Sequence, residues 1–244
     1  MASNLPTILL SSGEPSGIGP DICVTLAMKK IPARLAVLGD PDLLAERAGT
    51  LKLDLDIQEQ KKLSDIVPHR AGHLDVLGVS LKTPVCAGQL NSANAEYVIE
   101  LLKRGVELCK IYKKSAIVTA PVQKSVINQA GIKFTGHTEF LADLTGTRTP
   151  VMLLVAENMR VALATTHLPL HEVASVINRQ NLKETINVLS NDLEQRFGLN
   201  KPRIVILGLN PHAGEAGVIG NEELSLIHIC RCRRIERCRS RWSP

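Results

Sequence analysis

The sequence predicts an α/β protein with a central, mostly parallel sheet. Short apolar runs alternate with amphipathic stretches, and this β-α-β-α order is typical of a parallel sheet with helices packed against it. Two of the amphipathic stretches begin at Pro20 and Pro41, where a missing backbone N–H suits the first turn of a helix. Polar, glycine-containing loops follow several apolar runs, as expected where the strands of an open sheet end.

Length and composition limit the possible classes of protein. A chain of 244 residues can form one large α/β domain or two small ones. Aromatic residues make up only 2% of the chain, so Leu, Ile, Val and Ala have to fill the core. No apolar run reaches the roughly 18 to 20 residues that cross a bilayer, and the first residues lack the features of a signal peptide. We therefore expect a cytoplasmic protein that does not associate with membranes.

The net charge of +5 is confined to the end of the chain. Residues 225–244 contain six Arg and one Glu, which leaves 23 basic and 23 acidic residues elsewhere. A neutral body predicts no nucleic-acid partner. The three tail cysteines, Cys230, Cys232 and Cys238, lack the paired spacing of a zinc site. Those in the body lie in apolar settings that predict buried thiols. They are Cys23, Cys86 and Cys109.

The first elements follow from apolar runs and helix-start signals. They are a strand over 7–10, a helix over about 20–30, a strand over 34–38 and a helix from Pro41. The loop over 12–21 matches neither nucleotide-binding glycine pattern, so a tight strand-to-helix turn is favoured over a phosphate-binding loop. Residues 52–75 are polar and predicted irregular, with an edge segment over 53–57. His69 and His73 are expected in a solvated loop, because proline and glycine nearby disfavour a helix.

The remaining elements continue the alternation. They are a helix over 91–112, a strand over 116–119, a short helix ending at Gly131, strands over 151–155 and 160–164, a helix over 181–197, and a strand over 204–207. Asn181 and Glu184 have the spacing of a capping box at the start of the later helix. Lys124 lies just past a strand end, where a lysine can reach a substrate anion, although a solvated surface lysine is an equal alternative.

Three histidines occupy equivalent positions in the predicted fold. His137, His167 and His212 each follow an apolar run and lie among small, turn-forming residues. Loops at the carboxyl ends of strands carry the chemistry of open α/β sheets, so these imidazoles suggest a metal or acid/base site. Each could instead be a hydrogen-bonded structural residue. His167 and His212 as metal ligands would be one short of the usual three, and His171 is expected in solvent.

Five collinear segments resemble the 4-hydroxythreonine-4-phosphate dehydrogenase family. They are residues 13–21 (GEPSGIGPD), 119–124 (TAPVQK), 134–139 (FTGHTE), 164–169 (ATTHLP) and 208–215 (GLNPHAGE). The resemblance covers about residues 5–224. It implies two α/β/α subdomains around a mostly parallel sheet, similar to isocitrate and isopropylmalate dehydrogenases but incomplete. It also implies a cytoplasmic homodimer that acts in pyridoxal phosphate synthesis.

The resemblance also implies a site between the two subdomains. His137 and Thr138 would contact the substrate, and His167 and His212 would bind zinc, magnesium or cobalt. We assign catalytic roles to Lys124 and His137, and no residue is assigned to the cofactor, NAD or NADP. The implied reaction oxidises the secondary alcohol of 4-phosphooxy-L-threonine and decarboxylates the product to 3-amino-2-oxopropyl phosphate. A metal ion would bind the alcohol oxygen and stabilise the enolate, and the nicotinamide would take the hydride.

The family pattern ends near Leu224. Residues 1–224 are interpreted as an incomplete catalytic region, and 225–244 as an unrelated Arg- and Cys-rich tail, disordered or artefactual in origin. The third metal ligand and the residues that hold the substrate phosphate are expected beyond this match, and His228 does not replace them. We therefore expect weak or no activity. Alternatives are dehydrogenases of threonate or erythronate 4-phosphate, a metal-dependent hydrolase, and a non-catalytic binding protein.

Overall fold

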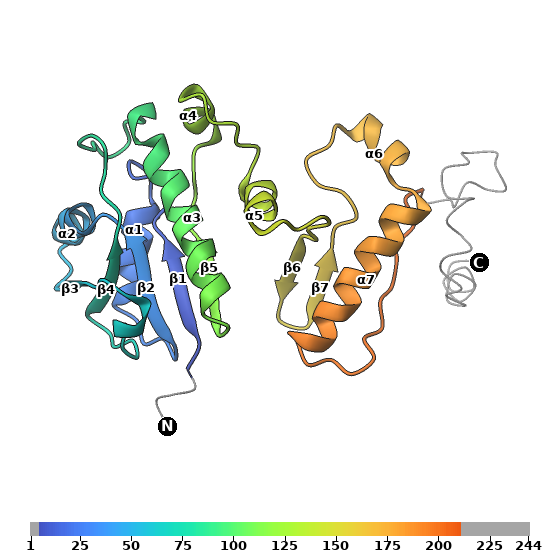
Figure 1. Ribbon diagram of the computed structural model, residues 1–244, viewed down its shortest axis with the longest axis horizontal. Coiled ribbons are helices and arrows are strands. Elements are labelled where there is room, and N and C mark those ends of the chain that lie inside the picture. The colour runs from blue at the N-terminus through green and yellow to red at the C-terminus, as the bar shows by residue number, and fades with distance from the viewer. Residues whose placement is uncertain (1–4, 211–244) are drawn as a thin grey trace, which may run out of the picture. The chain divides into compact units, whose positions relative to one another are not determined.

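The computed structural model describes residues 5–210, which belong to two compact units (Figure 1). The first unit ends at Gly146 and the second begins at Thr147. The first unit contains a five-stranded sheet in the order β3-β4-β2-β1-β5, and every neighbouring pair is parallel. Its strands are β1 (Thr7–Ser11), β2 (Arg34–Gly39), β3 (Asp56–Glu59), β4 (His73–Gly78) and β5 (Ser115–Thr119). The predicted parallel α/β sheet is confirmed.

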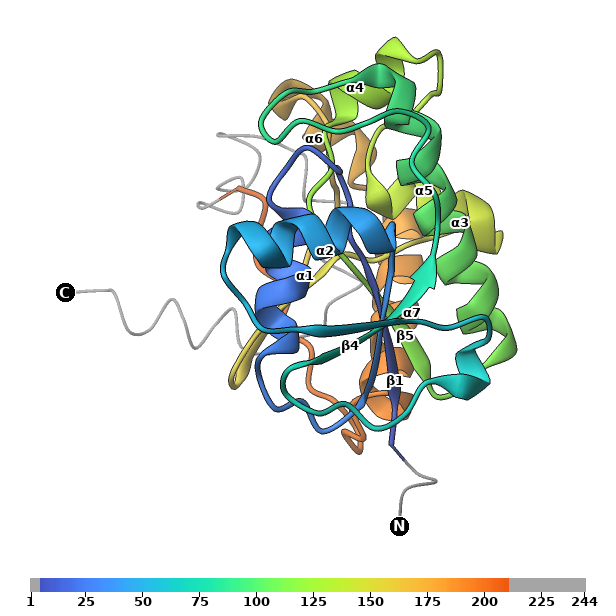
Figure 2. The ribbon, with the colours of Figure 1, turned by 90° about the vertical axis from the view of Figure 1, so that its left-hand side faces the viewer.

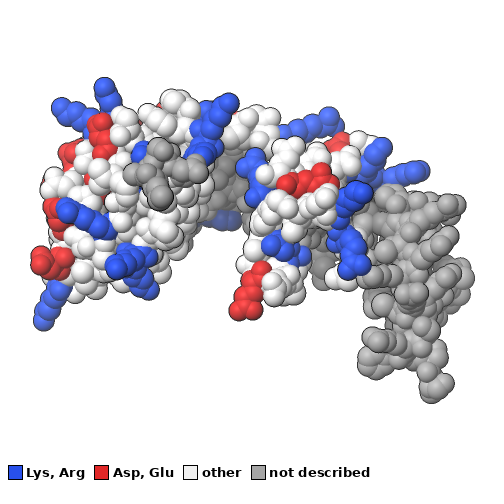
Figure 3. Space-filling model, turned by 90° about the horizontal axis from the view of Figure 1, so that it is seen from below, with Lys and Arg blue, Asp and Glu red and all other residues white. Residues whose placement is uncertain are grey.

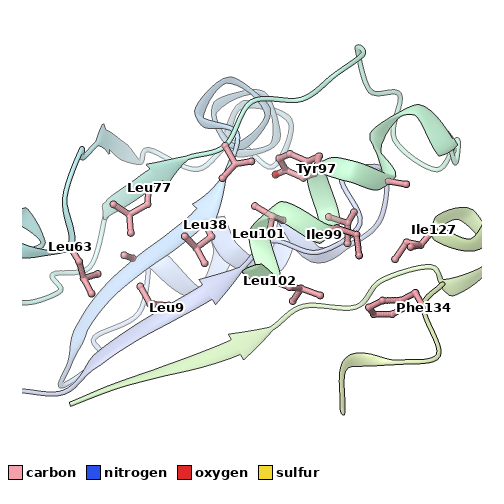
Figure 4. Packing of buried hydrophobic residues seen from close by; sticks show 14 of the residues in the cluster. Leu9, Leu38, Leu63, Leu77, Tyr97, Ile99, Leu101, Leu102, Ile127 and Phe134 are labelled. Carbon is pink, nitrogen blue, oxygen red and sulfur yellow. The ribbon is translucent and has the colours of Figure 1, made fainter. Parts of the chain in front are cut away.

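Helices cover both faces of this sheet. They are α1 (Gly19–Ala27), α2 (Pro41–Thr50), α3 (Ala95–Ile111), α4 (Lys124–Gln129) and α5 (His137–Thr145), with short 3-10 turns η2 (Leu63–Asp65) and η3 (Ser92–Asn94). Successive strand residues point to opposite faces, so Leu9 packs in the cluster that contains Leu101 of α3 (Figure 4). Leu10 packs instead with Val24 of α1 and Leu44 of α2, which lie on the other side of the sheet (Figure 2). Burial on both faces explains why β1 and β2 are continuous apolar runs.

The helix starts follow the predicted chemistry. Proline occupies the first turn of both α1 and α2. The Asp40 side chain caps α2 by accepting hydrogen bonds from the backbone N–H groups of Asp42 (3.0 Å) and Leu43 (3.1 Å), an arrangement that stabilises a helix by about 1 kcal/mol. The predicted helix over 91–112 forms as α3, with one apolar face buried, and Gly105 lies directly against the Ile117 side chain of β5.

The prediction of an irregular segment over 52–75 with an edge strand is correct in part: β3 lies at the edge of the sheet and residues 60–72 form no strand, but His73, predicted in a solvated loop, is buried in β4. Strand β4 begins at His73, and β3 lies slightly later than the predicted edge segment. The His73 ring is buried between two carboxylates, with Nδ1 2.9 Å from Asp56 Oδ2 and Nε2 3.2 Å from Asp75 Oδ1. Polar residues interrupt the apolar pattern of β4, but they satisfy one another inside the sheet. His69 is half-buried, with Nε2 2.9 Å from the Lys29 carbonyl oxygen.

Replacing His73 with leucine should lower the free energy of unfolding by about 2 kcal/mol. The change removes a partner of Asp75, which is 2% exposed and would retain the hydrogen bond from Gln60 Nε2 (2.8 Å). His69→Leu is the matched control, with an expected loss below about 1 kcal/mol because its side chain is only half-buried and contacts no buried carboxylate. Urea denaturation measures both variants, and equal losses would contradict the buried role of His73.

The cysteines of the first unit differ in exposure. Cys23 is buried as predicted, and burial raises the pKa of its thiol to about 12. Cys109 is half-buried. Cys86 is exposed, so its predicted burial is wrong. Its segment is a loop between Pro84 and Gly88, where the chain turns with a positive φ of 77°, and the neighbouring apolar residues therefore do not form a strand.

Over residues 147–210, the second unit contains an antiparallel hairpin and two helices. They are β6 (Leu153–Ala156), β7 (Met159–Ala162), α6 (Leu170–Val176) and α7 (Arg179–Gln195). The two predicted strands are thus confirmed with small shifts. Asn178, not Asn181, caps α7, because its Oδ1 accepts the backbone N–H of Asn181 at 3.0 Å. The predicted capping box is wrong for this reason, and Glu184 instead accepts a hydrogen bond from Thr149 Oγ1 at 3.2 Å.

The predicted strand over 204–207 does not form within the described residues. Its backbone belongs to no sheet there, although Ile204 and Ile206 are half-buried and Val205 and Leu207 are exposed. This alternation is that of a strand, but a strand also requires a hydrogen-bonded neighbour. Over residues 5–210, no helix has the length and apolar character needed to span a membrane. On the face shown in Figure 3, basic and acidic side chains are interspersed.

Candidate active site

The carboxyl ends of β1 and β5 bring two loops together. Ser11 and Thr119 are register partners in neighbouring parallel strands, so the loops that follow them leave the sheet at the same edge. The backbone N–H of Ala120 donates to the Ser11 carbonyl oxygen at 3.0 Å, and that of Glu14 donates to the Pro121 carbonyl oxygen at 3.0 Å. The two loops therefore form one connected surface.

Buried polar contacts hold the loop after β1. The Glu14 carboxylate is buried and accepts hydrogen bonds from the Ser16 hydroxyl (2.8 Å) and backbone N–H (3.3 Å). Arg47 of α2, which is also buried, donates to the Pro15 carbonyl oxygen at 3.3 Å and pairs with Asp21 at 3.4 Å. These side chains satisfy one another within the loop, in agreement with the tight turn that its sequence favours.

Lys124 and His137 lie near each other at this edge. Each is the first residue of its helix, α4 and α5 respectively, and the Lys124 side chain is exposed while His137 is half-buried. Burial and the positive charge of Lys124 lower the pKa of His137 below its usual value, with burial the larger cause. The Phe134 ring meets the imidazole edge-on, with centroids 5.9 Å apart. The imidazole is therefore neutral at neutral pH beside a cation.

The start of α5 offers unsatisfied hydrogen-bonding groups. No residue in the described part of the chain forms a hydrogen bond with His137 Nε2, although that atom is buried. Gly136, at the cap position of α5, provides no side-chain hydrogen bond to the helix end. The positive end of a helix dipole favours an anion, and Thr138 lies half-buried in the same turn. Together with Lys124, these groups suit a small ligand with an anionic group and a hydroxyl.

The His137 ring should titrate in a way that depends on Lys124. Its pKa is lowered in the folded protein, so the unfolded chain takes up a proton first as the pH falls. The associated stability is complete above about pH 6.5, the unfolded pKa, and declines below it. NMR titration should show a higher His137 pKa in Lys124→Met, whereas Lys103→Met, on the exposed side of α3, should leave it unchanged. An unchanged pKa in Lys124→Met would show that the two side chains do not interact.

In the second unit, His167 lies in the loop between β7 and α6. Its side chain is exposed and its backbone has a φ of 54°, the left-handed region that few non-glycine residues adopt. The two residues before it, Thr165 and Thr166, help to line a pocket of about 330 Å³. The pocket wall also includes Arg148, Thr149, Pro150, Leu163, Ala164, Asn181, Glu184 and Thr185. The predicted loop position of His167 is thus accompanied by a polar cavity and an unusual backbone conformation.

Metal binding by His167 and His212 remains a prediction. His212 lies outside the described residues, and between residues 5 and 210 no cluster of three His, Cys, Asp or Glu is placed to hold a metal ion. An exposed imidazole on a loop has the chemistry of a divalent-metal ligand, but a single imidazole does not define a site. His171 is 81% exposed on its side chain, as predicted.

Two buried residues that support the loop after β1 were not identified from the sequence: Arg47, and Tyr97, whose hydroxyl lies 2.9 Å from Ser12 Oγ. Tyr97 is one of only two tyrosines in the chain and lies within the apolar stripe of α3. A buried phenol needs a hydrogen-bond partner, so a tyrosine on the apolar face of this helix could have indicated a polar contact in the core. Arg47 carried no comparable signal, because most arginines on a helix are exposed.

Solved structures with a similar fold are dehydrogenases. A 4-hydroxythreonine-4-phosphate dehydrogenase from Klebsiella pneumoniae matches with a TM-score of 0.83 and 28% identity, over 92% of this chain and 70% of that one. A putative enzyme of the same name from Salmonella typhimurium has a TM-score of 0.81 and 28% identity, over 97% and 72%. A terephthalate 1,2-cis-dihydrodiol dehydrogenase from Burkholderia xenovorans shares the fold at 21% identity and a TM-score of 0.61, over 92% and 68%. The fold is thus that of the isocitrate/isopropylmalate dehydrogenase class, as predicted.

Sequence comparisons narrow this class to one family. The family model described as pyridoxal phosphate biosynthetic protein PdxA matches residues 31–235. A 4-hydroxythreonine-4-phosphate dehydrogenase from Methylococcus capsulatus is 50% identical over 222 residues, which are 91% of this chain and 67% of that one. Its counterpart from Pseudomonas aeruginosa is 48% identical, over 91% and 68%. The chain belongs to the PdxA family, whose named members are oxidoreductases, and the predicted resemblance is confirmed.

Proposed function

We propose that the chain oxidises and decarboxylates 4-phosphooxy-L-threonine to 3-amino-2-oxopropyl phosphate with NAD or NADP. Membership of the PdxA family supports this function. The observation that carries it in the structure is the neutral His137 beside the exposed cation Lys124, at the edge where β1 and β5 end. This pair provides one group that can hold a proton and one that can hold an anion.

The proposed roles follow from the chemistry of these side chains. Lys124 neutralises an anionic group of the substrate, and burial together with the charge of Lys124 favours an uncharged His137 by lowering its pKa. Neutral His137 accepts the proton of the substrate hydroxyl as the hydride leaves, and Thr138 contacts the substrate from the same turn of α5. The bound nicotinamide would accept the hydride from the carbon that carries this hydroxyl. The β-keto acid formed loses carbon dioxide, and the resulting enolate takes up a proton.

A divalent metal ion is the second cofactor of the proposal. His167 and His212 would contribute neutral nitrogen ligands to zinc, magnesium or cobalt. When bound, the ion would act as a Lewis acid toward the alcohol oxygen and the later enolate. The left-handed backbone of His167 supports a specific role for this residue, because strained conformations cluster at functional sites.

Formation of NADH or NADPH from 4-phosphooxythreonine, followed at 340 nm, tests the reaction, and detection of carbon dioxide tests the decarboxylation. A panel that includes threonate 4-phosphate and erythronate 4-phosphate tests the sister activities. A chain that binds none of these phosphorylated hydroxy acids in calorimetry would overturn the proposal. We also propose a cytoplasmic homodimer, and analytical ultracentrifugation would measure its mass.

His167→Asn should weaken zinc or cobalt binding at least about tenfold, because it removes an imidazole ligand while asparagine tolerates a positive φ. His171→Asn is the matched control four residues away, and its exposed ring predicts no change. Cobalt absorption spectra and calorimetry measure both. Equal affinity in the wild-type protein and the two variants would rule out His167 as a ligand.

A further inference from the structure

We propose that Gly13, anchored by the Tyr97 hydroxyl through Ser12, is a positioning residue that holds Lys124 beside His137. The inference rests on the proposed function, because it concerns the same site. Gly13, Ser12 and Tyr97 belong to the loop after β1 and to α3, not to the segment that carries His137. Gly13 acts instead through the turn that leads from β5 into α4.

The first step is the contact between Gly13 and that turn. Gly13 has a φ of 70°, and a Cβ atom there would overlap the Pro121 carbonyl oxygen and lie 3.0 Å from the Ala120 carbonyl oxygen. The next residue, Glu14, donates its backbone N–H to the same Pro121 oxygen at 3.0 Å. Only glycine therefore permits this approach of the two backbones. The loop after β1 fixes where Pro121 lies.

The second step is the anchor on the loop itself. Tyr97 of α3 is 1% exposed, and its hydroxyl lies 2.9 Å from Ser12 Oγ. The same hydroxyl oxygen accepts the backbone N–H of Asp40 at 3.1 Å. The phenol thus ties Ser12, next to Gly13, to the carboxyl end of β2. Burial raises the pKa of Tyr97 to about 12, so the hydroxyl keeps its proton throughout the physiological range.

The third step leads from Pro121 to Lys124. Two residues separate them, and the first, Val122, packs against the core cluster that contains Tyr97 and Ile127. Ile127 of α4 is fully buried in this cluster, as Figure 4 shows together with Tyr97 and Phe134. The turn is therefore held at Pro121 and the helix at Ile127. The backbone of Lys124 lies between these two fixed points, so the position from which its side chain starts is held.

The experiment measures how strongly Lys124 acts on His137. NMR titration gives the change in the His137 pKa on Lys124→Met, first in the wild-type protein and then in a Gly13→Ala background. His137→Gln identifies the resonance. Because Gly13→Ala displaces Pro121, we expect the change caused by Lys124→Met to fall by about half or more.

Gly72→Ala is the matched control. Gly72 has a similar φ of 80°, but an added Cβ would meet only Asp54 O at 3.9 Å, so this variant carries the backbone strain without the overlap. It should leave the Lys124-dependent change intact. If Gly13→Ala does not fold, Tyr97→Phe, which keeps the ring and removes the hydroxyl, is measured instead, and a smaller reduction is expected.

A full-sized Lys124-dependent change in folded Gly13→Ala, or in Tyr97→Phe where that variant replaces it, overturns the inference. The same holds if Gly72→Ala reduces the change equally, since strain alone would then explain it. The readout needs no substrate or cofactor. Failure of the proposed function would appear in the binding and turnover measurements and would leave this titration unaffected.

Discussion

Lys124→Met is expected to lower kcat/KM for 4-phosphooxythreonine at least about a hundredfold, equivalent to about 2.7 kcal/mol of transition-state stabilisation. The side chain is exposed at the start of α4, where no described contact holds it in a structural role, so its loss should leave the fold intact. The variant removes a cation whose charge lowers the pKa of His137. It therefore also allows His137 to become protonated at a higher pH.

The higher pKa of His137 in Lys124→Met makes the expected loss of activity depend on pH. A protonated His137 can no longer accept a hydrogen bond, so the loss of activity in Lys124→Met should grow as the pH falls toward 6. Lys103→Met, also an exposed lysine, is the matched control and should behave as the wild-type protein does. Calorimetric binding of 4-phosphooxythreonine gives a second readout in which affinity should fall about tenfold. Activity and affinity within threefold of wild type would remove Lys124 from the site.

Hydrophobic pattern was sufficient to predict the sheet of the first unit except where polar residues lie inside it. Strands β1 and β2 are continuous apolar runs, because helices cover both of their faces, whereas β5, at the edge of the sheet, has one face exposed. In β4, His73 and Asp75 break this pattern, yet both are buried and hydrogen-bonded to each other. The sequence shows each residue as polar but does not show that its partner is two positions away on the same face of a strand.

Local signals also fail where a neighbouring segment decides the outcome. Residues 204–207 have the alternation of a strand, but the described part of the chain supplies no strand beside them. Asparagine is a good capping residue, and two lie near the start of α7. The helix begins after Asn178, so Asn178 caps it and Asn181 does not. In each case the local preference was real, and tertiary context determined whether it was used.

The candidate site was also predicted only in part from the sequence. The sequence placed Lys124 and His137 each at a loop after an apolar run, and the structure shows them as the first residues of α4 and α5. Their electrostatic interaction depends on how those two helices pack, which no local motif specifies. The role of Gly13 could not be predicted from the sequence, because glycine is common in turns for several reasons. Only the structure shows that the Pro121 carbonyl oxygen lies where a Cβ atom of residue 13 would be.

Gly19→Ala should destabilise the first unit by about 3 kcal/mol or more and abolish substrate binding at the temperatures where it unfolds. An added Cβ would overlap the Ser12 carbonyl oxygen and lie 3.1 Å from Ala120 Cβ. Both neighbours belong to the connected loops after β1 and β5, and backbone cannot move aside as a flexible side chain can. Gly49→Ala is the opposite case, since nothing lies within 4 Å of the added atom on α2. In a helix, alanine is favoured over glycine by roughly 1 kcal/mol, so that variant should be more stable than wild type. Urea denaturation compares the two, and a Gly19→Ala variant as stable as wild type would show that the loops are not packed as tightly as the structure describes.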